Sequence, residues 1–347
     1  VRSNRTGRAT PSRKKKDARV KAWQITSLGD PWDELNVVDV DSPPTDLETV
    51  RIRVEATDLN FADILQCQGS YQIKQVPPFT PGMNATGTVI DANPNLGFAI
   101  GERIVGPTVG PFGGYAEEAI LLGERSHGVP DELDAISAMG AHVTHGTAWF
   151  ALHQRGKVQP GETVLVLAAA GGVGSAAVQM ASAFDCWVAA AAAGAQKTDF
   201  CRKLGADLVI DYDSDDLYQG IMDATDGRGV DVVYDPVGGR YFDIARRLLA
   251  FEGRLLIVGF ASGDIPSAPA NHALVKNYSI VGVHMGAYRE RDLPLVRRCY
   301  ADVHAALLAG TYGSVVTETI GFDALPHTLK RLANRQTMGR IVFVPTH

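Results

Sequence analysis

The chain has 347 residues, of which 45% are hydrophobic, and a formal net charge of −6. This length is typical of two domains, and the apolar content suffices for packed cores. No stretch is long and apolar enough to predict a transmembrane helix. Four scattered cysteines without C-x-x-C spacing argue against a disulfide framework or a cysteine zinc lobe, so we expect a cytoplasmic protein.

The charge is unevenly distributed along the chain. Residues 1–19 contain eight basic residues and one acidic residue, which gives this segment +7 and leaves −13 on the rest. The segment has almost no apolar side chains and is predicted to be a disordered basic tail without the hydrophobic region of a secretory signal. The acidic remainder gives no support to nucleic-acid binding by the folded part.

A mostly-β domain is predicted from residue 20 to residue 143. Its first strand is expected at 20–25, and residues 50–56 alternate apolar and charged side chains, as in a half-buried strand. Clusters of Gly, Pro and Asp predict turns at 41–44, 77–82 and 110–114.

From residue 144 to residue 286, near-continuous apolar strands alternate with helices, which predicts a doubly wound, six-stranded parallel sheet. The strand order 3-2-1-4-5-6 would form two mononucleotide-binding halves. The expected strands are 163–168, 187–192, 207–211, 230–235, 254–259 and 279–283. Residues 291–347 contain two amphipathic helices and a last strand at 340–344. We expect residues 287–347 to rejoin the first domain.

A glycine turn at the end of the first of these strands predicts a dinucleotide site. The strand, the turn and the alanine-rich helix that begins at Ser175 follow one another directly, although Ala169 stands where the usual fingerprint has its first glycine. Glycines let the backbone approach a pyrophosphate and let the helix pack close to the strand, while the helix N-terminus presents free N–H groups. The residues expected at the diphosphate are Ala170, Gly171, Gly172, Val173 and Gly174.

The second strand favours NADPH over NADH. An acidic residue that would bind the ribose 2′-hydroxyl is absent, because Ala192 stands at that position. Gly194 forms the following turn, and Lys197 lies within reach as a counter-charge for a 2′-phosphate, although it is also compatible with an exposed helix surface. The hydroxyl of Tyr212, after the third strand, is a further candidate contact.

Motifs in both domains carry a family resemblance. In the second domain they are AGGVG at 170–174, KLGAD at 203–207, YDPVGG at 234–239 and GRLLIVGFA at 253–261. In the first they are LNFAD at 59–63, QGSY at 68–71, PFTPGM at 78–83 and GGYAE at 113–117. Together they resemble the zinc-independent medium-chain dehydrogenases/reductases, and among these the zeta-crystallin-like NADPH:quinone oxidoreductases.

The resemblance implies a GroES-like catalytic domain and a Rossmann domain with the active site in the cleft between them. It also implies a homodimer, with a tetramer as the alternative, commonly joined through the edge strand at 279–283. Zinc-dependent relatives have a cysteine at the position of Asn60, Gly-His-Glu at 82–84 and a third ligand near Ala141, so no zinc site is expected. His142, His145 and His153 cluster in sequence but lack an acidic or cysteine partner.

The reaction that we expect is transfer of a hydride from NADPH to a quinone or another activated carbonyl or alkene. The Asn60 amide would donate a hydrogen bond to the developing negative charge, unless it only caps a turn. Tyr71 resembles the proton donor of related enoyl-thioester reductases, with a core aromatic role as its alternative. The resemblance places further residues at the cofactor: Gly146, Thr147, Val237, Phe260, Ala261, Met285 and Arg340.

Two residues depart from the family pattern, and two other functions remain open. Asp185 replaces a glycine and is expected to adopt the left-handed conformation. Asn84 replaces a more usual glutamate, which leaves the substrate undetermined. The first alternative function is an enoyl-thioester or enone reductase. The width of the substrate pocket would distinguish it from a quinone reductase. The second is an NADPH-binding structural or RNA-associated protein, which would require a basic patch on the folded surface.

Overall fold

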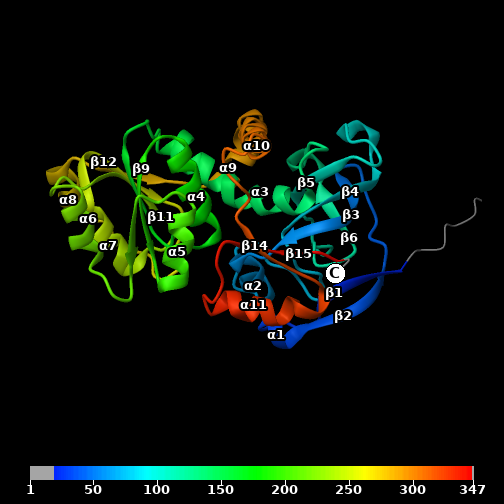
Figure 1. Ribbon diagram of the computed structural model, residues 1–347. Coiled ribbons are helices and arrows are strands. Elements are labelled where there is room, and N and C mark those ends of the chain that lie inside the picture. The colour runs from blue at the N-terminus through cyan, green and yellow to red at the C-terminus, as the bar shows by residue number, and fades with distance from the viewer. Residues whose placement is uncertain (1–18, 346–347) are drawn as a thin grey trace, which may run out of the picture.

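The computed structural model describes residues 19–345 and contains two large sheets joined by a long helix. Figure 1 shows this helix, α3 (Ala135–Trp149), running between the parallel sheet on one side and the mixed sheet on the other. A π-helical turn over Phe150–Arg155 continues it. Apart from Arg19, the predicted basic tail lies outside the described residues.

The second half of the chain forms a six-stranded parallel sheet in the order β10-β9-β8-β11-β12-β13. This order confirms the predicted doubly wound arrangement. The strands are β8 (Thr163–Val166), β9 (Trp187–Ala192), β10 (Leu208–Asp211), β11 (Val230–Asp235), β12 (Leu249–Ile257) and β13 (Ser279–Gly282). The strand β12 begins earlier than expected, because Leu249 already pairs with Val230 before a register shift.

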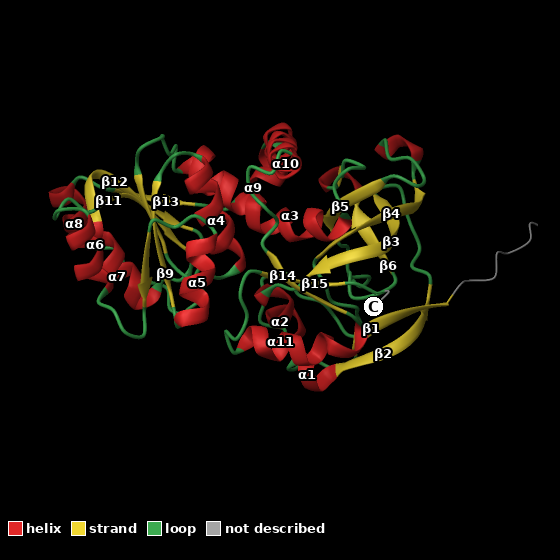
Figure 2. Ribbon diagram, viewed as in Figure 1, coloured by secondary structure: helices red, strands yellow, loops and turns green. Residues whose placement is uncertain are grey.

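Helices cover both faces of this sheet, as Figure 2 shows. Successive side chains of a strand point to opposite faces, so Val164 and Val166 pack into one core while Leu165 packs into the other. The helices on the first face are α4 (Gly172–Ala183) and α5 (Ala195–Lys203), and those on the second are α6 (Leu217–Ala224) and α7 (Gly239–Leu248). The short helix α8 (Ala270–Lys276) precedes the edge strand β13.

The mixed sheet has the order β14-β15-β3-β4-β5-β7, with β6 also paired to β3. Its strands are β3 (Thr49–Asp58), β4 (Asn84–Ala92), β5 (Arg103–Pro107), β6 (Glu118–Leu122), β7 (His127–Gly128), β14 (Val316–Ile320) and β15 (Arg340–Phe343). Strand β15 pairs antiparallel with β3, so the C-terminal segment returns to the first sheet as expected. A separate hairpin pairs β1 (Arg19–Ile25) with β2 (Leu35–Asp41).

The remaining helices join the two halves. The α2 helix (Phe61–Cys67) and α11 (Leu325–Ala333) contribute to one core beside the mixed sheet, with α1 (Pro31–Glu34) nearby. The helices α9 (Met285–Arg291) and α10 (Leu293–Leu308) follow the edge strand, and Cys299 and Tyr300 of α10 pack into the core of β8 and α4. Short 3-10 turns lie at Pro94–Leu96, Gly123–Arg125 and Phe322–Ala324.

Residues 143–144 lie inside α3, and residues 286–287 lie inside α9. The division into 20–143 plus 287–347 and 144–286 therefore stays a prediction, since both junctions are continuous helix. Asp185 has φ 57°, so the left-handed turn expected at this position is present. Across residues 19–345, no helix combines the length and apolar character needed to cross a membrane.

Candidate active site

The glycine turn has the geometry that a phosphate-binding turn requires. A Cβ on Gly174 would lie 2.3 Å from the Ala168 carbonyl oxygen, so only glycine permits this close approach of α4 to the strand end. A Cβ on Gly171 would meet only the same oxygen, at 3.3 Å, and its other sides face open space. The N–H groups of Gly172, Val173 and Gly174 stand in the first turn of α4, where no intrahelical acceptor exists.

A loop of the C-terminal segment gathers several of the predicted cofactor residues. Gly339 N donates to Ala170 O at 2.8 Å, and the Lys197 ammonium donates to Arg335 O at 2.8 Å. Arg335 Nη2 donates in turn to Ala261 O at 3.3 Å. Arg335 was missed by the sequence reasoning, because it belongs to no motif and reaches this place only through the fold.

Gly194 and Tyr212 form hydrogen bonds at the ends of two strands of the parallel sheet. Gly194 has φ 81°, and its N–H donates to Asp211 Oδ1 at 2.9 Å. The Tyr212 hydroxyl accepts the N–H of Ala168 at 3.1 Å. Tyr212 therefore holds the strand end that leads into the glycine turn, a role that the sequence did not suggest.

The residues predicted at the nicotinamide lie in two groups. A Cβ on Gly146 would lie 3.0 Å from Met285 Cε, so the glycine allows α9 to pack directly on α3. Thr147 is the next residue of α3 and is half-buried. Phe260 is 40% exposed and packs beside the turn at Gly238, whose neighbour Val237 donates its N–H to Asp235 Oδ1 at 2.8 Å.

Asn60 is held by Arg340, a residue from the other end of the chain. Arg340 Nη1 donates to Asn60 Oδ1 at 2.8 Å and to Leu59 O at 2.7 Å. Because the Asn60 oxygen is engaged, its buried Nδ2 faces the Asp58 carboxyl, on which it acts to lower the pKa, and it meets strict hydrogen-bond geometry with no described residue. Arg340 also lies beside the glycine turn, since a Cβ on Gly172 would come within 3.4 Å of its guanidinium.

Two buried carboxyl groups, which the sequence reasoning missed, surround this contact. Asp58 Oδ2 lies 3.7 Å from Arg340 Nη2. Burial raises the pKa of Asp58, while the Arg340 charge and the nearby amides of Asn60 and Asn84 oppose this rise. Burial and the neighbouring Asp58 raise the pKa of Asp63 to about 7.

Asp63 connects Asn60 to the cavity wall. Its Oδ2 accepts the Asn60 N–H at 2.8 Å and the Tyr115 hydroxyl at 3.0 Å, and its Oδ1 accepts the Met83 N–H at 2.9 Å. The motifs LNFAD, PFTPGM and GGYAE thus meet at one carboxyl group. The spacing of Asn60 and Asp63 at the start of a helix was the available sequence signal for this arrangement.

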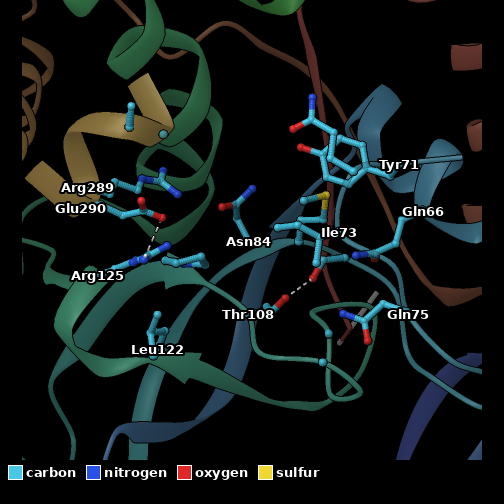
Figure 3. A pocket seen from close by; sticks show the side chains of 18 of the residues that line it. Gln66, Tyr71, Ile73, Gln75, Asn84, Thr108, Leu122, Arg125, Arg289 and Glu290 are labelled. Atoms are coloured by element: carbon cyan, nitrogen blue, oxygen red, sulfur yellow. Dashed lines mark hydrogen bonds and ion pairs between the residues drawn. The ribbon is translucent and has the colours of Figure 1, made fainter. Parts of the chain in front are cut away.

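A cavity of about 580 Å³ opens beside these residues, between the mixed sheet and α9. Figure 3 shows Tyr71 at one end of the cavity, Arg125, Arg289 and Glu290 at the other, and Asn84 between them. Tyr71 is half-buried and lines the cavity, whereas Asn60 is not among the residues that line it. The structure therefore brings Tyr71 and Asn84 to the cavity, whereas Asn60 reaches it only through Asp63, which also holds Met83 of the cavity wall.

The three clustered histidines pack against aromatic rings, with His142 and His145 buried and His153 half-buried between Trp149 and Phe184. His142 stacks on Tyr300 with ring centroids 4.8 Å apart, and His145 on Tyr312 at 4.9 Å. Within residues 19–345, no group of three or more His, Cys, Asp or Glu side chains is arranged to hold a metal ion. Asn60, Met83 and Ala141 also lack the ligand chemistry of the zinc site that relatives carry at these positions, so the residues do not fit zinc.

Comparison with known proteins agrees with this arrangement over both halves. Residues 46–148 match a family model described as an alcohol dehydrogenase GroES-like domain, and residues 172–302 match one described as a zinc-binding dehydrogenase. The chain is 35% identical to quinone oxidoreductase-like protein 2 of Bos taurus over 311 residues, which cover 89% of this chain and 88% of the relative.

Two relatives add chemical context. A 2-haloacrylate reductase of Burkholderia is 30% identical over 305 residues, which cover 85% of this chain and 90% of that protein. The structure of mycobacterial Rv1454c complexed with NADPH is similar with a TM-score of 0.85 at 27% identity, covering 94% of this chain and all of that one. The chain therefore belongs to the medium-chain dehydrogenase/reductase family, in its quinone oxidoreductase-like branch.

Proposed function

We propose that this protein is an NADPH-dependent reductase that delivers a hydride to a quinone or another activated carbonyl or alkene. The observation that carries the proposal is the buried amide Nδ2 of Asn60, which lies near the Asp58 carboxyl and belongs to a side chain that Arg340 holds in place. A buried donor without a partner is costly unless a ligand satisfies it. Through Asp63 this amide is joined to Met83 of the cavity wall, and it would donate to an oxygen that gains negative charge during reduction.

The residues around the glycine turn fit a dinucleotide phosphate. The first turn of α4 offers N–H donors to the diphosphate, and Lys197, whose ammonium donates to Arg335 O, brings a cationic side chain to the 2′-phosphate end. Gly146, Thr147, Phe260, Ala261 and Met285 would border the nicotinamide. When bound, NADPH supplies the hydride, and the protein orients the reactants and excludes water.

Asn60 and Arg340 act together in this proposal. The guanidinium fixes the amide with its oxygen inward, so that Nδ2 is oriented before the acceptor arrives. A donor that is already oriented needs no reorganisation as charge develops in the transition state. Arg340 is therefore a positioning residue that also lies against the phosphate-binding turn.

Tyr71 is the proposed proton donor at the other side of the cavity. Its N–H donates to Leu65 O at 3.1 Å, which anchors the backbone after α2, and its ring lines the cavity. A phenol can complete the reduction by protonating the carbon or oxygen that the hydride leaves negatively charged.

An enone or enoyl-thioester acceptor is the second candidate, and the polar cavity favours it. Its lining includes Gln66, Gln72, Gln75, Thr80, Asn84 and Thr108. Such a surface is well suited to a carbonyl compound with polar substituents. The relative whose name specifies reduction of a 2-haloacrylate supports an activated alkene as the acceptor.

We also propose a homodimer joined through the edge strand β13. This strand pairs only with β12 within the described chain, which leaves its outer edge open. Exposed apolar side chains accompany it, with Leu274 and Val275 on α8 at 76% and 82% exposure and Ile280 on the strand. Open edges and apolar patches are typical of association sites.

Four free, buried cysteines suit a reducing compartment and support a cytoplasmic location.

The test of the function is NADPH oxidation by the purified protein with representatives of three acceptor classes: quinones, enones and enoyl thioesters. We expect turnover with at least one class and much weaker turnover with NADH. If NADPH binds but no class is reduced, the structural or RNA-associated role replaces the enzymatic one. The same screen decides between quinones and activated alkenes as the preferred acceptor.

A further inference from the structure

One end of the cavity carries a concentration of positive charge that the hydride transfer itself does not require. Its lining includes three guanidinium groups, from Arg125, Arg289 and Arg291, and one carboxylate, from Glu290. Arg125 Nη2 lies 3.4 Å from Glu290 Oε1 and its Nε lies 3.6 Å from Glu124 Oε1, so two carboxylates balance this guanidinium. Arg289 and Arg291 carry the remaining positive charge. Figure 3 shows the pair beside Arg289, across the cavity from Tyr71.

Arg289 has donors available for a ligand. Its only hydrogen bond among the described residues runs from Nη2 to the Tyr300 hydroxyl, at 3.3 Å. No carboxylate within residues 19–345 forms an ion pair with it. A guanidinium has five N–H donors in a planar fork that matches a carboxylate or phosphate. Most of these donors therefore remain free at the cavity wall.

The Tyr300 side chain, which accepts the hydrogen bond from Arg289, is itself held in place by packing. Its ring stacks on His127 with centroids 3.9 Å apart and on His142 at 4.8 Å. A Cβ on Gly146 would lie 3.3 Å from Tyr300 Cε1, so the ring also packs against α3. The partner of the guanidinium is thus a rigid aromatic side chain, which reduces the entropy lost when Arg289 binds a ligand.

The charge contrast with the rest of the molecule strengthens the argument. The chain after residue 19 carries a net −13, yet this cavity end carries more guanidinium groups than carboxylates. An acidic molecule with a local cationic pocket attracts anions to that place and repels them elsewhere. The pocket therefore selects for an acceptor with negative charge.

We infer that the acceptor carries an anionic group, a carboxylate or a phosphate, that Arg289 binds at the end of the cavity opposite Tyr71. This inference rests on the proposed function, because it names the class of acceptor for the same site. The anion would lie on the guanidinium fork while the carbonyl or alkene extends past Asn84 towards Tyr71. Neutral quinones with a long apolar tail would lose this contact and would meet the polar lining instead.

The test compares acceptors that differ only in charge. The carboxylate-bearing enone 3-benzoylacrylate and its methyl ester form one pair, and crotonyl-CoA provides phosphate groups in place of the carboxylate. We expect wild-type kcat/KM to favour the acid over the ester. In the Arg289→Gln variant, the ratio of kcat/KM for the acid to kcat/KM for the ester should fall about 10- to 100-fold, which is the effect expected from losing one hydrogen bond between charged groups. Arg289→Lys should restore part of it. If Arg289→Gln lowers kcat/KM for crotonyl-CoA alone, the anionic group that Arg289 binds is a phosphate.

Three controls separate the contact from general charge and from folding. Arg298→Gln removes an exposed arginine of α10 that pairs with Asp302, and it should leave the preference unchanged. Tyr300→Phe removes the hydrogen bond to Arg289 but keeps the stacked ring, and it should weaken the preference less than Arg289→Gln. Calorimetric binding of the saturated analogue 3-benzoylpropanoate measures the anion site without turnover, and Arg289→Gln should weaken this binding by a similar factor.

The outcomes distinguish the two proposals. If acid and ester are reduced equally well and Arg289→Gln leaves their ratio unchanged, the anionic acceptor is rejected while the reductase stands. If no acceptor is reduced but 3-benzoylpropanoate binds in a manner that depends on Arg289, the anion site stands and the reductase is rejected. If 3-benzoylpropanoate binds equally to wild type and Arg289→Gln, the anion site at Arg289 is rejected.

Discussion

The guanidinium of Arg340 donates a hydrogen bond to the side-chain oxygen of Asn60 across 2.8 Å. This contact links β15, near the end of the chain, to the residue that precedes α2. It determines which end of the Asn60 amide is engaged and leaves Nδ2 buried without a partner in the described part of the chain. The same guanidinium lies near Gly172, so one side chain contacts both the proposed donor and the glycine turn.

Asn60→Ala should lower kcat about 100-fold, because it removes a donor that we place at the developing negative charge. KM for NADPH should change little. Steady-state kinetics with the acceptor found in the screen measures both quantities. Asn60→Asp should be similarly impaired, since a carboxylate keeps the shape and the contact with Arg340 but cannot donate.

Arg340→Lys, compared with Asn60→Ala, shows whether Arg340 acts through Asn60. Arg340→Lys keeps a charge near Asp58 but loses the fork that contacts both Leu59 and Asn60, and it should lower kcat more than it raises KM for NADPH. The exposed Asn95→Ala serves as the matched asparagine control. Full activity in Asn60→Ala would remove this amide from the mechanism.

Tyr71→Phe tests the proposed proton donor. The ring that lines the cavity remains, so acceptor binding should persist, while kcat for enones and enoyl thioesters should fall about 10- to 100-fold. Measurement of kcat across pH in both proteins separates loss of a proton donor from loss of packing. Unchanged turnover of Tyr71→Phe on every accepted substrate would return this residue to a packing role.

Lys197→Gln tests the cofactor preference. We expect KM for NADPH to rise about tenfold, because one charged contact with the 2′-phosphate is lost, and KM for NADH to stay the same. Lys203→Gln, at the exposed end of the same helix α5, is the matched control. An equal rise for both cofactors would show that Lys197 supports the fold of the C-terminal loop instead, through its contact with Arg335.

Stability should decrease as pH falls from about 6.5 to about 4. Burial lowers the pKa of His145 and of His304 to about 4, below the ordinary value of about 6.5 that the unfolded chain has. In this window the unfolded chain binds more protons, so acid favours unfolding by up to about 3 kcal/mol for each histidine. Asp63 acts in the opposite sense, because its pKa is raised to about 7.

Comparison of variants isolates the histidine effect. His304→Gln should reduce the dependence of the unfolding free energy on pH between 4 and 6.5, as measured by urea denaturation. The exposed His327→Gln should retain the wild-type dependence. If the unfolding free energies of His304→Gln and of the wild type change with pH in the same way, His304 does not contribute to this pH dependence.

Ile280→Lys tests the proposed dimer. The substitution places a charge on the open edge strand β13, and charged side chains on such edges oppose strand pairing. Light scattering after size exclusion should show half the wild-type mass. Leu47→Lys replaces an exposed leucine that is far from β13 in the sequence, and it should leave the mass unchanged. A monomeric wild type would reject the dimer outright.

Much of the parallel sheet could be predicted from the chain itself, because its buried strands are continuous apolar runs and its turns contain glycine. The Trp187–Ala192 and Val230–Asp235 strands have the expected bounds, and the order of all six agrees. The start of β12 at Leu249 was missed, since the register shift near Val230 depends on the neighbouring strand.

The amino-acid sequence alone determined the family, the fold and the glycine turn after β8, because these depend on motifs, on local periodicity and on a glycine, Gly174, with no room for a Cβ. Only the tertiary structure decided that Arg340 orients Asn60, that Asp63 joins three motifs and that Tyr212 supports the turn instead of projecting from it. It also placed Arg289 at the cavity and Arg335 beside Lys197. These contacts join residues far apart in the chain, so no local pattern encodes them, and they exist only once both sheets have packed around α3.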